Sequence, residues 1–281
     1  MMRQLVVNAD DLGLTVGVND GIFDAHELGV LTSASVFANA PASADAIRRA
    51  RTHISLGIGA HLALVDGTPV LPARSVPTLV TDDGRFRRSW RPFIVACLQG
   101  RVSMVEIERE LTAQIERLRD AGVLLTHLDA HQHVHLYPPI FAIVARLAAR
   151  FAVPVVRVPY EGGSWLNAVL WLWARRNYRT AAALGVRTPR FVGRLDTGVL
   201  SRDALRRLVP AIGPGVTELM VHPGYVDDQL RRMPTRLVES RLNEVALLCS
   251  LQTRALLAGE RIHLVRHDLA PSVRRSLRHV S

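Results

Sequence analysis

The segment from residue 127 to 135 carries the densest set of groups in this chain that could do chemistry. It holds four of the eleven histidines and one aspartate: His127, Asp129, His131, His133 and His135. Imidazole and carboxylate groups at this density are what a divalent metal site needs. If the segment is extended, His131, His133 and His135 face the same side. Only one or two of them are then expected to reach an ion, and the others are expected to orient a ligand or to contact substrate.

Four further donors follow short apolar runs elsewhere in the chain: Asp10, Asp11, His61 and His222. Such runs are typical of buried strands, and in parallel α/β folds the reactive groups collect beyond the carboxyl ends of the strands. A single histidine beside an apolar run is more often a core or loop residue, but four segments together predict one shared metal site. Two imidazoles and one carboxylate would leave an open position for water on the ion. Of the neighbouring aspartates, one could bind the ion while the other acts as a general base.

Alternating strand and helix patterns predict the elements that must position these groups. Strands are expected at 3–9, 34–38, 56–63, 123–128, 153–158, 216–221 and 262–265. Helices are expected at 17–27, 42–51, 106–121 and 138–151, with a long loop over the site at 66–91. This order predicts an α/β fold in which a parallel sheet closes into a distorted, TIM-like β/α barrel, as a single domain over 1–281.

Composition excludes several classes of protein. The net charge of +10 comes from arginine without any lysine, and the arginines are scattered in small groups with no nucleic-acid-binding motif, so no nucleic-acid partner is expected. The apolar runs are shorter than the ~20 residues of a spanning helix, and the first residues enter a strand pattern, so a cytoplasmic protein is expected. Cys97 and Cys249 are too few for a thiolate metal cluster and are expected in the core.

Five segments in order, 8–13, 32–35, 59–62, 127–135 and 222–224, resemble the YdjC-like carbohydrate deacetylases, a family that includes chitooligosaccharide deacetylase. The resemblance extends from residue 3 to about residue 227. It implies a distorted barrel that hydrolyses the acetamide of N-acetyl amino sugars with one divalent cation. On this chain it assigns Asp11, His61 and His131 as metal ligands, Asp10 as the general base and His222 as the general acid.

Five more residues are expected to contact substrate or to orient the ligands, the base or the acid: Asn8, Asp129, His133, His135 and Arg157. Zinc is expected rather than magnesium, because Mg²⁺ prefers oxygen ligands. A glycoside hydrolase would also use two carboxylates, but it needs them on opposite sides of the scissile bond, which adjacent Asp10 and Asp11 fit poorly. A noncatalytic glycolipid-binding protein is a second alternative, which the presence of bound metal would distinguish.

Within the family, the segments 157–159 and 214–219 resemble the branch associated with hopanoid biosynthesis, HpnK. This implies an N-acetylglucosaminyl hopanoid as substrate, with soluble chitooligosaccharides as the alternative. Trp165, Trp171 and Trp173 are three of the four tryptophans, and three arginines follow them at 175, 176 and 179. The stretch around 160–190 is therefore interpreted either as a membrane-facing insertion or as an internal helix with a basic C-terminal end. Two interactions are therefore considered: peripheral contact with the inner membrane face, and assembly as a homodimer.

Overall fold

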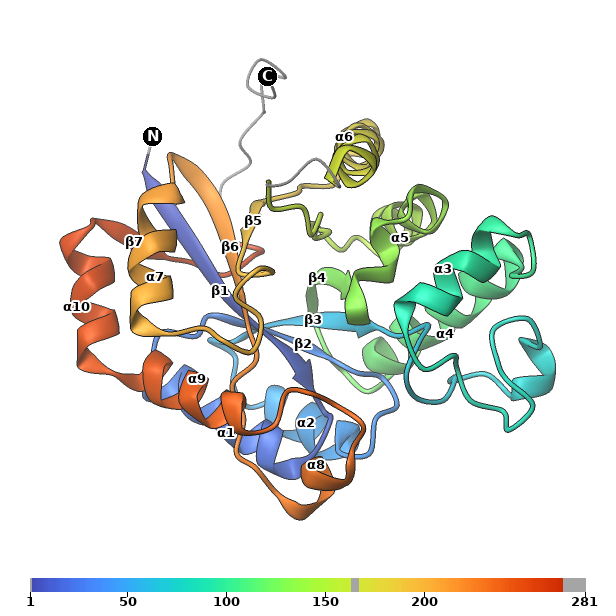
Figure 1. Cartoon of the computed structure of the whole chain (residues 1–281), viewed down its shortest axis with the longest axis horizontal. Coiled ribbons are helices and arrows are strands. Elements are labelled where there is room, and N and C mark those ends of the chain that lie inside the picture. Colours follow the sequence, from blue (N-terminus) through green and yellow to red (C-terminus); the bar gives the residue numbers. More distant parts are fainter. Residues whose placement is uncertain (1, 163–166, 270–281) are drawn as a thin grey trace.

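The sheet is parallel throughout, and each strand delivers its carboxyl end to the same edge. The computed structural model describes residues 2–162 and 167–269. Its strands are β1 (Arg3–Leu12), β2 (Ser33–Val36), β3 (Gly57–Leu62), β4 (Leu125–Ala130), β5 (Arg190–Val192), β6 (Gly215–Val221) and β7 (Ile262–Leu264). They are ordered β4-β3-β2-β1-β6-β5, and β7 pairs with the first residues of β1. Figure 1 shows the helices arranged around this sheet.

The sheet curls into a half-barrel, and only isolated pairs continue it beyond β4. The segment 153–158 pairs with β4 at Leu128 and Val156, and with the chain before β5 at Val155 and Arg187. Four backbone hydrogen bonds hold this segment, two to Leu128 and two to Arg187, so its pairing is confined to one bridge on each side. The prediction of a regular strand at 153–158 is therefore wrong, and the three-residue β5 was not predicted. The predicted α/β fold, a single domain with a distorted β/α barrel, is confirmed.

The four predicted helices are present as α1 (Val16–Glu27), α2 (Ser43–Ala50), α4 (Met104–Asp120) and α5 (Pro138–Arg150). In α4 the Ser103 side chain caps the first turn by accepting from the Glu106 N–H, and the apolar stripe that predicted this helix is buried. The tryptophan-rich stretch, for which an internal helix was one of two interpretations, contains α6 (Asn167–Ala183). The helices that were not predicted are α3 (Trp90–Leu98), α7 (Arg202–Leu208), α8 (Asp228–Arg232), α9 (Glu239–Cys249) and α10 (Leu251–Gly259). Short 3-10 helices occupy Ala73–Ser75, His131–Leu136 and Val209–Ala211.

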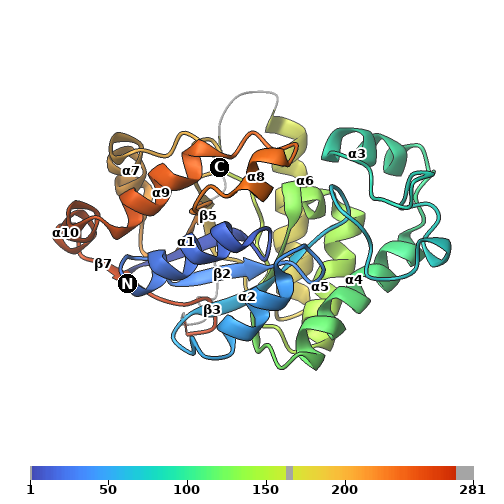
Figure 2. The same cartoon turned by 90° about the horizontal axis from the view of Figure 1, so that it is seen from below.

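The long loop predicted before α3 is present, and α4 holds it in place. Glu110 is fully buried and accepts hydrogen bonds from the backbone N–H groups of Val70 (2.7 Å) and Leu71 (3.0 Å). One turn earlier, Glu106 accepts from the N–H group of Thr78 at 2.8 Å. Figures 1 and 2 both show this loop and α3 at the opposite end of the molecule from α7 and α10. The loop is thus a fixed wall beside the ends of β3 and β4.

Candidate active site

The three predicted metal ligands converge at the carboxyl ends of neighbouring strands. Asp11 belongs to β1, His61 to β3, and His131 directly follows β4. Asp11 Oδ1 lies 3.5 Å from His61 Nε2 and 3.3 Å from His131 Nδ1, and the two nitrogens are 3.3 Å apart. Donors about 2.1 Å from a tetrahedral ion are separated by about 3.4 Å, so this triangle has the size that one zinc ion requires. A fourth position on such an ion would remain for water or substrate.

Asp129 on β4 holds the ring of His61 in the orientation that a ligand needs. His61 Nδ1 donates to Asp129 Oδ1 at 2.7 Å, which leaves Nε2 directed at the other two donors. A carboxylate behind a metal-binding histidine fixes its tautomer and makes it a stronger donor. Burial alone would lower the pKa of His61, but Asp129 and Asp11 outweigh it and raise that pKa to about 10. Metal binding must therefore displace a proton from this site.

The second aspartate, Asp10, is held separately from the ligand triangle. Arg157 Nη1 and Nη2 donate to its two oxygens at 2.7 Å each, and Asn8 Nδ2 donates to Oδ1 at 3.0 Å. Burial opposes ionisation, but the charge and hydrogen bonds of Arg157 keep the pKa of Asp10 well below its ordinary value. Asp10 is thus a buried carboxylate, fixed in orientation and ionised over the whole neutral range.

Arg157 is completely buried and is surrounded by carboxylates. Besides Asp10, its Nη2 lies 2.9 Å from Asp129 Oδ2, and its Nε donates to Glu218 Oε1 on β6 at 2.7 Å. These charges raise the pKa of Arg157 well above its ordinary value, although burial opposes this. Glu218 was not among the predicted site residues. A carboxylate within the otherwise mostly apolar strand β6 was the feature that could have indicated it. One guanidinium therefore connects Asp10, Asp129 behind His61, and Glu218 on β6.

Arg241 on α9 binds the other oxygen of the metal-facing aspartate. Its Nη2 donates to Asp11 Oδ2 at 2.5 Å, and its Nε donates to the carbonyl of Leu237 at 3.0 Å. Asp11 has a left-handed backbone with φ of 69°, which turns its side chain toward this arginine and the two histidines. Nothing in the sequence distinguished Arg241 from the other arginines of the chain, so it was missed as well.

A buried hydroxyl links the first and fourth strands beneath the site. Ser35 Oγ donates to Asp129 Oδ2 at 2.6 Å and accepts from Asn8 Nδ2 at 2.9 Å. His127 Nε2 lies 3.0 Å from Ser35 Oγ. Gly59 makes room for this ring, because a Cβ there would lie 2.4 Å from His127 Nε2. His127 is buried and is linked to the Asp129 side chain through the Ser35 hydroxyl. It does not belong to the ligand triangle.

His222 follows β6 and lies close enough to Asp10 and Asp11 for their charges to act on it. Its backbone N–H donates to Glu244 Oε2 on α9 at 2.5 Å. Burial lowers the pKa of His222 to about 4, although Asp11 and Asp10 oppose the shift. The ring is therefore neutral at pH 7 in the absence of substrate. A proton that His222 delivers to a leaving group must reach it during the reaction cycle.

The three alternating histidines after β4 do not face one side, because the segment is not extended. His131–Leu136 is a 3-10 helix in which Gln132 and His133 have left-handed backbones, with φ of 51° and 57°. His135 is buried and its Nε2 donates to the carbonyl of Arg157 at 2.9 Å. His133 packs edge-on to Phe191, and its buried Nδ1 has no hydrogen-bond partner among the described residues. The expectation of an extended segment is wrong, and His131 alone reaches the ligand triangle.

The tryptophan-rich segment forms part of α6. Trp165 lies outside the described residues. Trp173 packs edge-on to Tyr137 at 5.3 Å between ring centroids and contacts the core, whereas Trp171 is partly exposed with Arg175 over its ring. Within the described ranges, no helix has both the length and the apolar content to cross a membrane.

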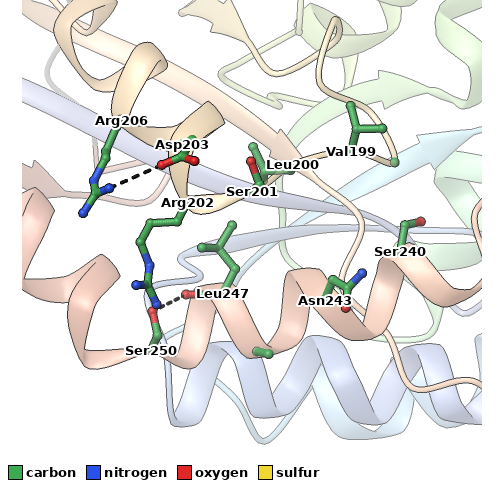
Figure 3. A pocket seen from close by; sticks show the side chains of 12 residues that line it. Val199, Leu200, Ser201, Arg202, Asp203, Arg206, Ser240, Asn243, Leu247 and Ser250 are labelled. Carbon is green, nitrogen blue, oxygen red and sulfur yellow. Dashed lines mark hydrogen bonds and ion pairs between the residues drawn. The ribbon is translucent and has the colours of Figure 1, made fainter.

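A surface groove of about 610 Å³ lies between α9 and the segment that leads into α7 (Figure 3). Ser240, Asn243 and Leu247 line it from α9, and Arg206 on the α7 side is paired with Asp203 at 3.3 Å. None of the three metal-ligand candidates lines this groove. It is a feature of the outer face of α9, whereas Arg241 and Glu244 project from the same helix toward the site.

Comparison with known proteins agrees with this geometry. Residues 4–259 match the family described as YdjC-like protein. A carbohydrate deacetylase of Brevibacillus brevis is 35% identical over 263 residues, which cover 93% of this chain and 97% of that protein. A carbohydrate deacetylase of Geobacillus stearothermophilus is 35% identical over 271 residues, which cover 94% and 97%. A solved structure from Enterococcus faecalis V583, described as a candidate cellobiose-phosphate cleavage protein, superimposes with a TM-score of 0.81 at 26% identity, covering 96% of this chain and all of the other. The chain belongs to the YdjC-like protein family.

Proposed function

We propose that this protein is a metal-dependent hydrolase that removes the acetyl group from N-acetyl amino sugars. The observation that carries the proposal is the triangle of Asp11 Oδ1, His61 Nε2 and His131 Nδ1, with sides of 3.3–3.5 Å, beside the separately held carboxylate of Asp10. The names of the similar proteins from Brevibacillus and Geobacillus support the same reaction and substrate class. A noncatalytic binding protein would need neither a ligand set of this size nor a second, ionised carboxylate.

The residues of this chain suit the two proton transfers of amide hydrolysis. Water adds to the acetyl carbon, the C–N bond breaks, and acetate and a free amine are released. Asp10 accepts the proton of the attacking water, and Arg157 and Asn8 hold its oxygens in place for this. His222 receives a proton and passes it to the departing nitrogen, which would otherwise be a very poor leaving group. A divalent ion held by the triangle would polarise the acetyl carbonyl and make water more acidic.

The ligand chemistry favours zinc over magnesium. Two of the three donors are imidazole nitrogens, and Mg²⁺ prefers oxygen ligands in octahedral geometry. Asp129 behind His61 also matches the carboxylate–histidine arrangement common at zinc sites. Chelation should abolish acetate release, and zinc should restore more activity than magnesium at equal concentration.

For the substrate, we propose an amino sugar on a lipid, specifically an N-acetylglucosaminyl hopanoid. Support comes from the outer face of α6, where Val169 and Leu172 are 54% and 56% exposed beside the exposed side chains of Arg175, Arg176 and Arg179. Apolar and cationic side chains together on one helix face suit the interface of an anionic membrane. The packed side of α6 contacts the His131–Leu136 turn, so one helix connects this outer face to the turn that carries His131.

Mass spectrometry of two acetylated substrates tests both levels of the proposal. The zinc-loaded protein is incubated with an N-acetylglucosaminyl hopanoid in vesicles and with soluble N,N′-diacetylchitobiose, and loss of one acetyl group is followed. Faster deacetylation of the lipid substrate supports the hopanoid assignment; faster deacetylation of the disaccharide supports the soluble alternative. No acetyl loss from either substrate, with metal bound, would overturn the deacetylase function.

Two variants control this experiment. Asp10→Asn keeps all three ligands and should abolish turnover on both substrates, which excludes a contaminating enzyme. Leu172→Ser removes exposed apolar surface from α6 and should reduce vesicle binding and deacetylation of the lipid substrate, while leaving the disaccharide rate unchanged.

A further inference from the structure

We propose that the indole of Trp90 is a stacking platform for the ring that adjoins the acetylated sugar of the substrate. Trp90 is the first residue of α3 and is 46% exposed, the most exposed of the tryptophans in the described residues. The proposal rests on the deacetylase function and specifies which substrates that site prefers. A saturated ring presents a face of C–H groups, and such a face packs on the electron-rich face of an indole.

The first observation is that the metal-ligand turn caps the helix carrying Trp90. Ser89, at the N-terminus of α3, forms no side-chain capping bond. Instead, the side chain of Gln132 accepts from the Trp90 N–H at 2.9 Å. Gln132 directly follows His131 and has a left-handed backbone with φ of 51°. Trp90 is therefore fixed to the residue next to a metal ligand.

A second, independent contact fixes the chain that leads into Trp90. The Asp66 N–H donates to the carbonyl of Arg87 at 2.9 Å, and the Phe86 N–H donates to that of Gly67 at 3.0 Å. The Asp66 carboxylate in turn lies 3.8 Å from His131 Nε2. Backbone hydrogen bonds thus join residues 86–87, just before Trp90, to residues 66–67, which follow β3. Through Asp66, this joined segment lies beside Nε2 of His131, the ring nitrogen that does not belong to the ligand triangle.

The remaining observations concern the platform itself. Phe93, Ala96 and Cys97 bury one side of α3 in the core, so the helix cannot easily move away from the turn. The guanidinium of Arg91 lies over one face of the Trp90 ring, 5.4 Å from its centroid, so a stacked substrate ring would occupy the other face with these donors nearby. An exposed indole with donors nearby, on a packed helix whose first N–H is bonded to the residue after His131, matches the needs of a ring bearing hydroxyl groups.

Three glycosides of N-acetylglucosamine test the platform: the methyl glycoside, which has no second ring; N,N′-diacetylchitobiose, whose second ring is a sugar; and the cyclohexyl glycoside, whose second ring is alicyclic. Trp90→Ala should lower kcat/KM about tenfold for the ring-bearing substrates, mainly through KM, and leave the methyl glycoside unchanged. Trp90→Phe should retain most of the preference. An effect on the disaccharide alone identifies the ring as a sugar, and an effect on the cyclohexyl glycoside alone identifies it as an apolar aglycone.

Leu98→Ala is the matched control, because Leu98 is 63% exposed on the same helix but lies at its other end. It should alter none of the three rates. Calorimetry with the metal-loaded Asp10→Asn protein gives a readout that does not depend on turnover: adding Trp90→Ala should weaken disaccharide binding about tenfold. Equal losses on all three substrates, or no loss on any, would overturn the platform, whereas an absence of acetate release by the unmodified protein would overturn the deacetylase function instead.

Discussion

Asp11 is shared between a cation of the protein and the metal-binding triangle: Oδ2 accepts from Arg241 Nη2 at 2.5 Å, while Oδ1 faces His61 and His131. Burial raises the free-energy cost of a charged Asp11, but Arg241 keeps its pKa well below the ordinary value. The protein thus holds this ligand ionised without depending on a bound ion, and directs only one of its oxygens toward the metal position.

Arg241→Leu should consequently destabilise the protein most when no metal is bound. Removing one partner of a buried ion pair leaves an uncompensated charge, which typically costs about 3–5 kcal/mol. Zinc supplies the missing positive charge, so the gain in stability on adding zinc should be larger for the variant than for the unmodified protein. Denaturant unfolding with chelator and with zinc measures both quantities.

Arg231→Leu provides the control, since Arg231 and Glu239 form a pair at 2.6 Å with more than half of each side chain exposed. Its loss should change the free energy of unfolding by less than about 1 kcal/mol, with or without zinc. Equal destabilisation by the two variants would contradict the role of Arg241.

The neighbouring aspartates should separate into two phenotypes. Asp10→Asn retains the three donors of the triangle, so zinc content should stay near that of the unmodified protein while kcat falls about 10²-fold or more. Asp11→Asn removes a charged ligand and should reduce zinc content itself. Elemental analysis of the purified variants, paired with acetate release, distinguishes them; the same loss of metal in both would contradict the division of roles.

The convergence of Asp11, His61 and His131 could be predicted from the sequence because each lies where a strand ends, and strand ends meet in a parallel sheet. Of the supporting residues, Asn8, Asp129 and Arg157 were expected, whereas Glu218 and Arg241 were not. Arg241 is brought to Asp11 only by the packing of α9, across 230 positions of the chain. The turn at 131–136 was mistaken for an extended segment because alternation of polar residues does not reveal left-handed backbones at Gln132 and His133.

The barrel closure shows the same limit for secondary structure. The apolar residues at 153–158 predicted a strand, and those side chains are indeed buried, but the segment pairs only through single bridges to Leu128 and Arg187 within the described residues. β5 has only three residues, which are too few to show the alternation of apolar and polar side chains that predicts a strand. The long elements with strong apolar patterns were therefore enough to predict the fold class. The irregular side of the barrel, formed by β5 and the segment 153–158, could not be predicted in the same way.

Glu244 should make stability depend on pH. Burial raises its pKa from 4.5 to about 7, while the hydrogen bond from the His222 backbone opposes this. Between pH 4.5 and 7 the folded protein keeps a proton that the unfolded chain has lost, so this group's contribution to stability is full below pH 4.5 and is lost as pH rises through 7. The decline is of the order of 3 kcal/mol.

Glu244→Gln keeps an oxygen to accept from the His222 N–H and cannot ionise, so its free energy of unfolding should fall less than that of the unmodified protein over the same pH range. Glu239→Gln, at an exposed position on the same helix, should leave the pH profile unchanged. Parallel profiles for the unmodified protein and Glu244→Gln would show that the carboxyl group is already ionised below pH 4.5.

His222 should matter only when the leaving group needs a proton. An amide nitrogen is expelled slowly unless it is protonated, and a well-placed general acid is typically worth ~10²–10⁴-fold. The phenolate released from 4-nitrophenyl acetate leaves without such help. His222→Ala should therefore lose about 10²-fold or more in kcat on the acetylated amino sugar, keep its zinc, and retain most of its activity on 4-nitrophenyl acetate.

Asp10→Asn should lose activity on both substrates, because both need an attacking water. Alanine retains the backbone N–H that bonds Glu244. If the imidazole of His222 only fills space in the buried site, the His222→Ala variant would lose both activities together, and its free energy of unfolding would fall with them.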